Sequence, residues 1–397
     1  MIEGRKYHAD FSVRFIAIVF AFAVMFAACS DTPTESNSVG DSLLADNLAV
    51  RDTTLQSVAH SSFRKYLPMD SRVNLVGHHG NYSAYTALQF FSSGFPNRDT
   101  IQVVSATLKL RLVSWYGDST GTFAFDVHKV TQSWAQQTLQ WDSIQTGFYE
   151  SSVVRGSYSG GVRADTDTIS VSLDTSMVRE WLQPATVTSY GIILVPTTSC
   201  SVVRGINEFD YDSTQFYPTL LVVARNLAGT VQDTTTYASG GDTFAGNIDD
   251  LASNPSLLYL QAGVVYRSTL KFDVSGITRG SLIQSAELLL VRDPATTILT
   301  KFSGDPAISV HVLMGEDSSN FEALSSTGQQ VSGTDTFSVD LRHAVQLWIK
   351  GPNYGLLLRT TSLSEFDSFD LYTFHTQATA SQAVRPRLKI RYVFPTL

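Results

Sequence analysis

Five consecutive residues could present a catalytic serine, because Gly117-Asp118-Ser119-Thr120-Gly121 matches the pattern G-x-S-x-G. In hydrolases with this motif, the serine lies on a sharp turn between a strand and a helix, which exposes its hydroxyl for nucleophilic attack. Here the following segment, 123–128, alternates large apolar residues with other residues, which is typical of a strand. We therefore interpret the motif as a hairpin loop and predict no catalytic role for Ser119.

The densest histidine site is Gly77-His78-His79-Gly80, which could contribute metal ligands. Neither H-E-x-x-H nor a spaced set of cysteines and histidines accompanies it. Adjacent side chains on an extended segment also point to opposite faces. We interpret the site as a glycine-flanked loop with exposed imidazoles, and metal or ligand contact is the alternative.

Three acidic residues alternate near the middle of the chain, at Glu208, Asp210 and Asp212. On a strand they would share one face, and their hard carboxylate oxygens suit Ca²⁺. A D-x-D-x-D-G loop is absent from the sequence, so we predict no cofactor and leave a structural Ca²⁺ at these three residues as an open option. Glycoside cleavage would need two facing carboxylates at a set separation, which the spacing along a sequence cannot reveal.

Aromatic side chains are the residues best suited to a sugar ligand, because a flat ring stacks on the apolar face of a pyranose. Trp181 and Trp348 lie in two similar apolar segments, and we predict that both anchor a core. Trp134 and Trp141 flank a loop, where a structural role competes with ligand contact. The predicted ligand-binding residues are Trp115, Tyr116, Tyr82, Tyr85 and Trp141.

One pattern of residues is written twice along the chain, in 73–226 and again in 257–394. Five pairs of short anchors keep their order, although the offset between partners varies from 164 to 182 residues. Two copies are too few for a solenoid, and about 170 residues are enough for each copy to form its own core. The anchors are Leu88-Gln89-Phe90 with Leu270-Lys271-Phe272, Ser105–Leu108 with Ser285–Leu288, Trp181 with Trp348, Tyr190–Leu194 with Tyr354–Leu358, and Pro218–Leu220 with Pro386–Leu388.

Strand patterns dominate both copies. Apolar residues alternate with polar ones, as in 108–112 and 388–392, while the unbroken runs 192–195 and 356–358 predict strands covered on both faces. Each copy also has one short helical turn, with Asp174 and Asp340 expected at the N-caps. We predict an all-β protein of two tandem jelly-roll-like β-sandwiches, each with one short helical turn.

The first residues predict targeting rather than structure. An apolar run at 15–28 follows basic residues and is shorter than the about 20 residues of a membrane-spanning helix, so we interpret 1–28 as a signal peptide. Phe26-Ala27-Ala28-Cys29 resembles a bacterial lipoprotein box, whose cysteine is lipidated, with simple secretion as the alternative. Residues 29–53, rich in Ser, Thr, Asp and Asn, predict a flexible tether before modules at 54–226 and 227–397.

Charge and cysteine content exclude several classes of function. The chain has 28 Lys and Arg residues against 36 Asp and Glu residues, and its net charge of −8 disfavours nucleic acid and anionic lipid surfaces as partners. Hydrophobic residues make up 43% of the chain, which indicates a globular body rather than disorder. Cys200 is the only cysteine besides Cys29, and we predict a small buried side chain there rather than a reactive thiol.

The repeated segments resemble the DNRLRE-domain proteins, a family that overlaps the disaggregatase-related repeats and carbohydrate-binding module family 96. The DNRLRE tract itself is absent, and the second copy lacks the paired tryptophans of 134–141. The resemblance implies β-sandwiches on bacterial extracellular proteins, with carbohydrate binding in some members, and it carries over no binding residue. It rests on 270–275, 285–290, Phe337–Asp340, Trp348, Asn353–Leu358 and Arg385–Leu388, and in the first copy on Val127–Thr131, Ser133-Trp134 and Leu139–Trp141.

These features together predict a non-catalytic lipoprotein of the bacterial cell envelope, anchored to the outer membrane or cell surface only through lipid on Cys29. Its expected partner is a polysaccharide or cell-surface glycan. A structural or adhesive module with a protein partner is the alternative from another class. A glycan hydrolase or lyase is the weaker alternative, because its acids could not be found by spacing.

Replacement of the cysteine in the predicted lipoprotein box tests the anchor. A Cys29→Ala variant is expected to lose palmitate labelling and to leave the membrane fraction, because each acyl CH₂ buried in the bilayer contributes about 0.8 kcal/mol. Metabolic labelling and membrane fractionation measure both effects. A variant that stays in the membrane fraction as the parent chain does would contradict the anchor.

Overall fold

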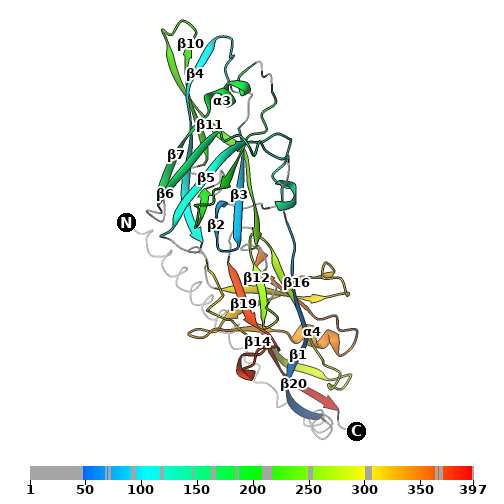
Figure 1. Ribbon diagram of the computed structural model, residues 1–397. Coiled ribbons are helices and arrows are strands. Elements are labelled where there is room, and N and C mark those ends of the chain that lie inside the picture. Colours follow the sequence, from blue (N-terminus) through cyan, green and yellow to red (C-terminus); the bar gives the residue numbers. More distant parts are fainter. Residues whose placement is uncertain are drawn as a thin grey trace, which may run out of the picture. The chain divides into compact units, whose positions relative to one another are not determined.

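The computed structural model describes most of the chain after residue 47. The prediction of an all-β protein is confirmed, with two ten-stranded sheets in a sandwich- or barrel-like arrangement and the short helices α3 (Thr175–Trp181) and α4 (Arg342–Trp348). Figure 1 gives the course of these elements. The described residues are 48–67, 69, 73–90, 95–116, 120–144, 147–161, 167–183, 185, 187–207, 217–248, 254–299, 306–362, 365 and 370–395.

Sheet 1 contains ten strands from the first two thirds of the chain, and strand β11 closes it by pairing with both β10 and β3. Strand β7 lies off the main path and pairs with β4. The order is β11 (Gln232–Ile248), β10 (Thr219–Asn226), β4 (Ile101–Tyr116), β9 (Val203–Asn207), β2 (Val73–His79), β3 (Tyr82–Phe90), β8 (Ile192–Pro196), β5 (Thr122–Lys129) and β6 (Gly156–Gly161), with β7 (Asp167–Leu173) beside β4.

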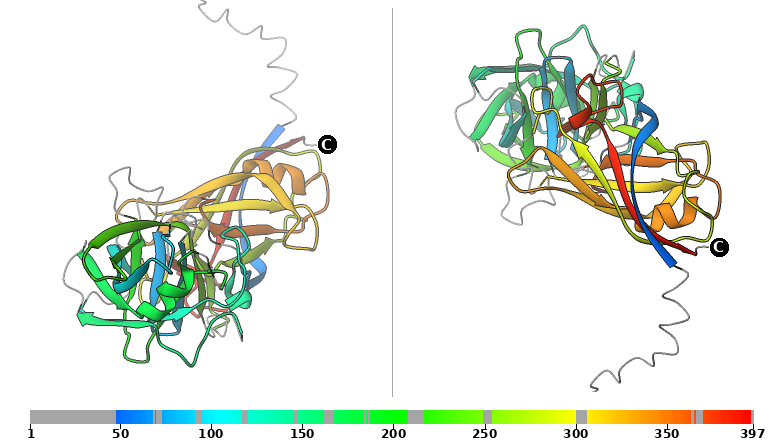
Figure 2. Two further views of the ribbon diagram at one scale, coloured as in Figure 1. Left: turned by 90° about the horizontal axis from the view of Figure 1, so that it is seen from above. Right: turned by 90° about the horizontal axis from the view of Figure 1, so that it is seen from below.

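Sheet 2 is closed in the same way, because β1 pairs with both β20 and β13. Both views of Figure 2 show the blue strand β1 running beside the red strand β20. The order is β1 (Leu48–Arg64), β20 (Arg387–Pro395), β14 (Leu282–Val291), β17 (Thr336–Asp340), β16 (Phe321–Gln330), β15 (Ala307–Leu313), β18 (Leu356–Thr360), β13 (Tyr266–Phe272), β12 (Leu257–Gln261) and β19 (Leu371–His375).

Two strands pair outside the half of the chain in which they were expected. Strand β1 begins the first half but belongs to sheet 2, and β11 begins the second half but belongs to sheet 1. The module boundary predicted at residue 226 therefore stays a prediction. One strand from each side of it pairs with strands from the other side. By its contacts, the chain divides into a large unit, 52–392, which holds nearly all of both sheets, and a small one, 1–51 with 393–397.

The duplicated anchors have the same pairing in both sheets. Leu88 of β3 faces Ile192 of β8, and the corresponding residues Leu270 and Leu356 face each other between β13 and β18. The strands on the other side of β8 and β18 also correspond, because β5 pairs with β8 as β15 pairs with β18. Val127 faces Leu194 in sheet 1, and Val310 faces Leu358 in sheet 2. The repeat in the sequence is thus a repeat of strand register.

Glycine is required at one position of the repeat. Gly191 and Gly355 have φ values of 86° and 97°, in the left-handed region that L side chains rarely adopt. A Cβ atom at Gly191 would lie 2.0 Å from the carbonyl oxygen of Leu88, and one at Gly355 would lie 2.8 Å from that of Leu270. The Tyr-Gly anchors therefore mark the point where β8 and β18 start against a neighbouring backbone.

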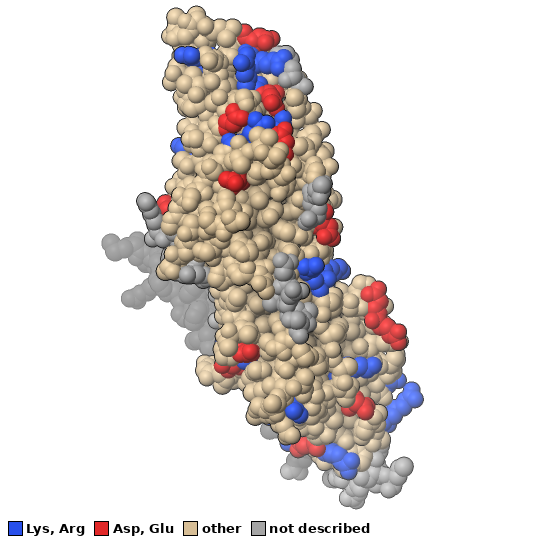
Figure 3. Space-filling model, viewed as in Figure 1, with Lys and Arg blue, Asp and Glu red and all other residues tan. Residues whose placement is uncertain are grey.

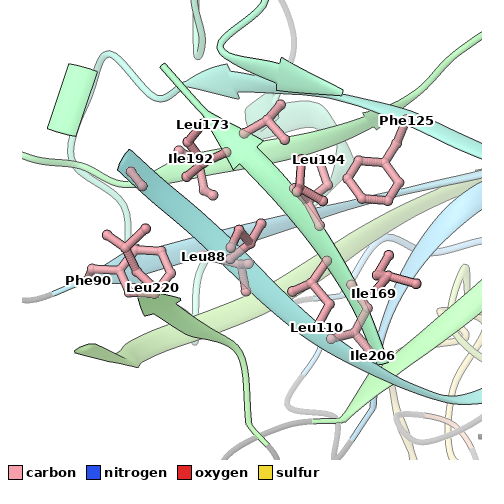
Figure 4. Close-up of a cluster of buried hydrophobic side chains, with 14 of the residues drawn as sticks. Leu88, Phe90, Leu110, Phe125, Ile169, Leu173, Ile192, Leu194, Ile206 and Leu220 are labelled. Carbon is pink, nitrogen blue, oxygen red and sulfur yellow. The ribbon is translucent and has the colours of Figure 1, made fainter. Parts of the chain in front are cut away.

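The core of sheet 1 is built by alternating side chains from many strands. Figure 4 shows residues from β3, β4, β8 and β10 pointing toward one another, and they are almost completely buried. Residues 192–194 and 356–358 are all buried, which confirms that β8 and β18 are covered on both faces. Trp181 and Trp348 are buried in α3 and α4, as predicted.

The helix starts agree with the prediction in one copy and differ in the other. Asp174 is the N-cap of α3, and its Oδ1 accepts a hydrogen bond of 2.9 Å from the backbone N–H of Ser176. In the second copy the N-cap is Leu341, so the assignment of Asp340 was wrong by one residue. Asp340 still accepts a hydrogen bond from the Arg342 backbone N–H, at 3.0 Å, and it is ion-paired with the Arg342 guanidinium.

The loop at 117–121 is not a hairpin, which corrects another prediction. Strand β4 ends at Tyr116 and pairs with β7, β9 and β10, whereas β5 starts at Thr122 and pairs with β6 and β8. Strands β9, β2, β3 and β8 separate the two in sheet 1. Ser119 itself lies outside the described residues, and a strand rather than a helix follows it.

A pair of leucines tests the core of sheet 1. Leu194 of β8 is completely buried, so Leu194→Ala is expected to lower the free energy of unfolding by about 2–5 kcal/mol through lost contacts and a cavity. Leu227, in the turn after β10, is 68% exposed, and Leu227→Ala should change the stability by less than about 0.5 kcal/mol. Urea unfolding of both variants measures the difference, and equal losses would place Leu194 outside the core.

Candidate functional site: an aromatic surface patch

The outer face of sheet 1 carries a second, smaller apolar cluster. Side chains alternate along β3, so that Leu88 enters the main core while Ala87 points to the other face. Ala87 forms this outer cluster with Ile193 of β8 and Ala245 of β11. The described residues of 131–148, which are 131–144 with 147 and 148 and which we call the Trp loop, pack against these side chains with Leu139, Ile144 and Phe148.

One hydrogen bond joins the two ends of the Trp loop, and another ties the loop to the residue before Gly191 and β8. Thr131 donates from its backbone N–H to the Phe148 carbonyl at 2.9 Å. The indole N–H of Trp134 donates to the Tyr190 carbonyl at 2.8 Å. A buried or half-buried indole usually finds such a partner, because an unpaired N–H is costly to desolvate. Trp134 is therefore a positioning residue of the loop.

Five half-buried aromatic residues surround this cluster, and we call them the aromatic patch: Tyr85, Trp134, Trp141, Tyr149 and Tyr190. The ring centroids of Tyr85 and Trp141 are 5.0 Å apart in an edge-to-face arrangement. Such pairs are favourable beyond their buried area, so each ring restricts the other. The patch thus holds rings in fixed orientations while leaving part of each accessible.

Burial favours the protonated form of two phenols of the patch, Tyr85 and Tyr149. Burial raises the pKa of Tyr85 above its ordinary value, and the neighbouring Tyr149 adds to the rise. Burial also raises the pKa of Tyr149. Because both hydroxyls keep their proton at neutral pH, each can donate and accept a hydrogen bond.

The structure brings together two of the predicted ligand-binding residues and separates the others. Tyr85 and Trp141 meet in the patch, although they are 56 residues apart in the sequence. Tyr82 and Tyr116 are each only 1% exposed, so the prediction that they contact a ligand is corrected. Their rings pack at 5.5 Å in a buried cluster with Phe244, and burial raises the pKa of both.

Trp115 lies outside the patch. It is half-buried near the end of β4, where it faces Arg204 of β9. The side chain of Arg204 is itself almost completely buried, and its Nε donates to the Ser114 carbonyl at 2.9 Å. Trp115 is therefore a separate candidate for ligand contact, distinct from the patch.

Charged side chains beside the patch are paired with one another. Glu150, next to Tyr149, accepts from the Arg155 guanidinium at 2.8 Å, and Arg155 also binds Asp174 at 2.7 Å. Lys129 forms an ion pair with Glu180 and lies 3.8 Å from Glu150. The group has two basic and three acidic members, hence a net charge of −1. On the face that Figure 3 draws, acidic and basic side chains are interspersed among uncharged residues.

A buried charge network lies in sheet 2. The guanidinium of Arg267 binds the Glu365 carboxylate through two hydrogen bonds of 2.9 and 3.1 Å, and Arg359 donates to the same carboxylate at 2.9 Å. Arg359 also donates to Nε2 of His311 at 3.2 Å, while Nδ1 of His311 lies 2.9 Å from the Glu322 carbonyl. The side chain of Glu365 is only 1% exposed, so the network is a structural element rather than a ligand surface.

The sequence reasoning missed this network and its histidine. His311 in β15 corresponds to His128 in β5, since His311 faces Leu357 and His128 faces Ile193. Both imidazoles are buried, and each bonds a backbone carbonyl through Nδ1. The repeated pair Val127-His128 and Val310-His311 was the signal that could have revealed them.

The remaining predicted site residues give no further candidate. Cys200 is a buried free thiol, as predicted, and donates to the Val202 carbonyl at 3.2 Å. His78 and His79 are half-buried in strand β2 rather than exposed in a loop. In the described part of the chain, no group of three or more His, Cys, Asp or Glu residues could hold a metal ion. The predicted residues Cys29, Glu208, Asp210 and Asp212 lie outside the described residues.

Two findings bear on relatives and membranes. Among the described residues, no helix is both long and apolar enough to cross a bilayer. Comparison with protein-family models, with curated proteins and with solved structures finds no match to this chain. The resemblance to DNRLRE-domain proteins therefore stays a prediction.

The buried imidazole of His311 predicts a pH dependence of stability. Burial lowers its pKa below the ordinary value of 6.5, and the hydrogen bond with the Glu322 backbone carbonyl offsets part of this. The nearby charges of Arg359 and Arg267 lower the pKa further, and the charge of Glu365 raises it by less. The unfolded state then takes up a proton more readily than the folded state, so the stability is full above about pH 6.5 and falls as the pH drops below it.

A His311→Gln variant should lose this part of the pH dependence. One proton can contribute at most about 1.4 kcal/mol per pH unit. Urea unfolding of the parent chain and the variant between about pH 8 and about pH 5 measures the two slopes. Identical slopes below pH 6.5 would show that His311 takes up its proton equally well in the folded state.

Proposed function

We propose that this chain binds an uncharged polysaccharide at a bacterial cell surface, through the aromatic patch and without acting on the glycan. The observation that carries the proposal is the meeting of Tyr85 and Trp141, whose half-buried rings are 5.0 Å apart on the outer face of a rigid sheet. Rings held this way can stack on the apolar faces of pyranoses with little loss of side-chain entropy on binding.

Polar groups at the edge of the patch support the proposal. The hydroxyls of Tyr85 and Tyr149 are available in protonated form, so they can bond sugar hydroxyls as donor or acceptor. Specific ligand sites commonly combine an apolar or aromatic lining with a few placed polar groups. The patch has this composition.

Electrostatics favours an uncharged glycan over an acidic one. The paired charges beside the patch sum to −1, and the whole chain has a net charge of −8. Neither would attract a polyuronate, because like charges repel and no unpaired arginine lies among these five residues. We therefore expect xylan or a glucan to bind better than alginate or pectin.

Affinity electrophoresis through gels that contain each polysaccharide tests the proposal. Residues 48–397 should be retarded by xylan or a glucan, and Trp141→Ala and Tyr85→Ala should each weaken the retardation about tenfold or more. A well-buried aromatic contact contributes about 1.5–3 kcal/mol, and about 1.4 kcal/mol corresponds to tenfold. Release of soluble sugar from the same polysaccharides would instead support the hydrolase or lyase alternative.

Two further variants make the test specific. Tyr354→Ala is the matched control, because Tyr354 is the half-buried counterpart of Tyr190 in sheet 2 and should leave the retardation unchanged. Trp115→Ala tests the separate candidate on β4. Loss of retardation with Trp115→Ala alone would contradict the aromatic patch, and no retardation by any glycan would favour the structural or adhesive alternative.

A further inference from the structure

The first strand of each half of the chain completes the sheet formed mainly by the other half, and these two exchanged strands correspond residue by residue. Both β1 and β11 contain 17 residues. Ser57 of β1 faces Phe272 of β13, and Ser239 of β11 faces Phe90 of β3. Ser57 and Ser239 are 182 residues apart, as are Phe90 and Phe272.

The irregularities of the two pairings also correspond. The register of β1 against β13 shifts between Ser57 and Ala59, and that of β11 against β3 shifts between Ser239 and Gly241. A β-bulge at the same place in both ladders means that the two strand positions have the same geometry. Each strand therefore has the same place in its sheet as its counterpart has in the other sheet, although the side chains differ: Phe244 of β11 is completely buried, and its counterpart in β1 is Ser62.

The two exchanged strands differ greatly in how firmly they are held. Strand β11 buries Phe244, Ala245 and Ile248, and burial of large apolar side chains is a main stabilising contribution in folded proteins. Among residues 49–64 of β1, whose burial the structure describes, Ser57 alone is buried, and Val58 is 61% exposed. Strand β1 is thus held mainly by backbone hydrogen bonds and polar side chains.

The side-chain hydrogen bonds and the ion pair of β1 within sheet 2 are polar contacts, some exposed and some part-buried. The hydroxyls of Ser61 and Thr269 are 2.7 Å apart, and those of Ser62 and Ser268 are 2.8 Å apart. Asp52 forms an ion pair with Arg391 at 2.8 Å, with more than half of each side chain exposed. Surface ion pairs of this kind contribute little to stability, because water and salt screen the charges. Local opening of β1 should therefore cost much less than unfolding of the whole chain.

The connections of the strands point to β1 as the mobile partner. Strand β11 is joined to β10 by the tight turn 227–231 and continues toward β12, so both of its ends are bound to paired strands. Within the described residues, β1 joins the rest of the fold only through its C-terminal end, at 65–67. Release of β1 would leave the edges of β13 and β20 unpaired, and open edges recruit another strand.

From these observations we propose that β1 is a transferable strand, and that a second copy of this chain can supply the β1 that fills the position between β13 and β20. Strand β1 would pair with β13 and β20 of a second copy in the same way as it pairs with those of its own chain. Transfer of β1 between copies therefore gains few contacts and loses few. A tethered strand competes at an effective concentration on the order of millimolar, so exchange between copies requires a high protein concentration.

Single cysteines at one hydrogen-bonded pair test the proposal in the full chain, with Cys29 and Cys200 replaced by serine. Chains with Ser61→Cys are mixed at high concentration with chains with Thr269→Cys, incubated, diluted and oxidised. Only exchange between copies brings these two residues together, because the hydroxyls that they replace are 2.7 Å apart in the β1–β13 pairing. We expect a disulfide-linked dimer in the mixture, severalfold above the level of either variant alone.

A matched pair of double variants reports where β1 lies within one chain. Ser61→Cys with Thr269→Cys should form a disulfide within the monomer at low concentration. The control combines Ser61→Cys with Ala87→Cys. Ala87 of β3 faces Thr243 of β11, and Thr243 is the counterpart of Ser61. Ala87 would therefore face Ser61 if β1 paired with β3 in sheet 1. A disulfide in the control but not in the first variant would overturn the exchange of strands.

A third outcome distinguishes the pairing of β1 in sheet 2 from its transfer between copies. If the first double variant forms its disulfide within the monomer while the mixture of single variants gives no dimer above background, β1 stays in its own chain. That result would overturn transfer to a second copy. Neither experiment depends on a glycan, so failure here and failure of polysaccharide binding are distinguishable.

Discussion

Pairing of strand β11 is the interaction on which the rest of sheet 1 depends. Its first part pairs with β10 and its last part with β3, and the bulge between Ser239 and Gly241 lies at the start of the pairing with β3. This pairing places Phe244 in a buried cluster and Ala245 on the outer face, beneath the Trp loop. Because side chains alternate along a strand, a shift of one residue would exchange these two positions. The core and the floor of the aromatic patch are therefore set by one register.

Exchange of β1 and β11 links the two halves of the chain more closely than a tandem arrangement would. Each sheet is closed by a strand from the other repeat, so neither is complete without residues that lie more than a hundred positions away in the sequence. Such non-local pairing delays folding, because the loop entropy must be lost before the contacts form. The two strands nevertheless differ in role: β11 contributes large buried side chains, while β1 contributes mainly backbone pairing and polar contacts.

The same alternation sorts the aromatic residues between core and surface. Tyr82 and Tyr85 lie three residues apart on β3, which puts them on opposite faces, one in a buried cluster and one in the patch. The Trp loop then decides which outward-facing rings are grouped, because it brings Trp141 to Tyr85 and fixes Trp134 on the Tyr190 carbonyl. A cluster of rings built in this way is pre-organised, and our functional proposal rests on that property.

The sequence alone determined the local features of this protein. Alternating residues predicted strands, the unbroken runs at 192–195 and 356–358 predicted strands covered on both faces, and Trp181 and Trp348 were predicted in the core. Only the tertiary structure decided which strands pair. The alternation along a strand indicates which side chains are buried but not the neighbour that buries them. Since β1 and β11 pair in the same register with corresponding strands, the pattern along each strand could not show which sheet it joins. The meeting of Tyr85 with Trp141 could not be predicted either.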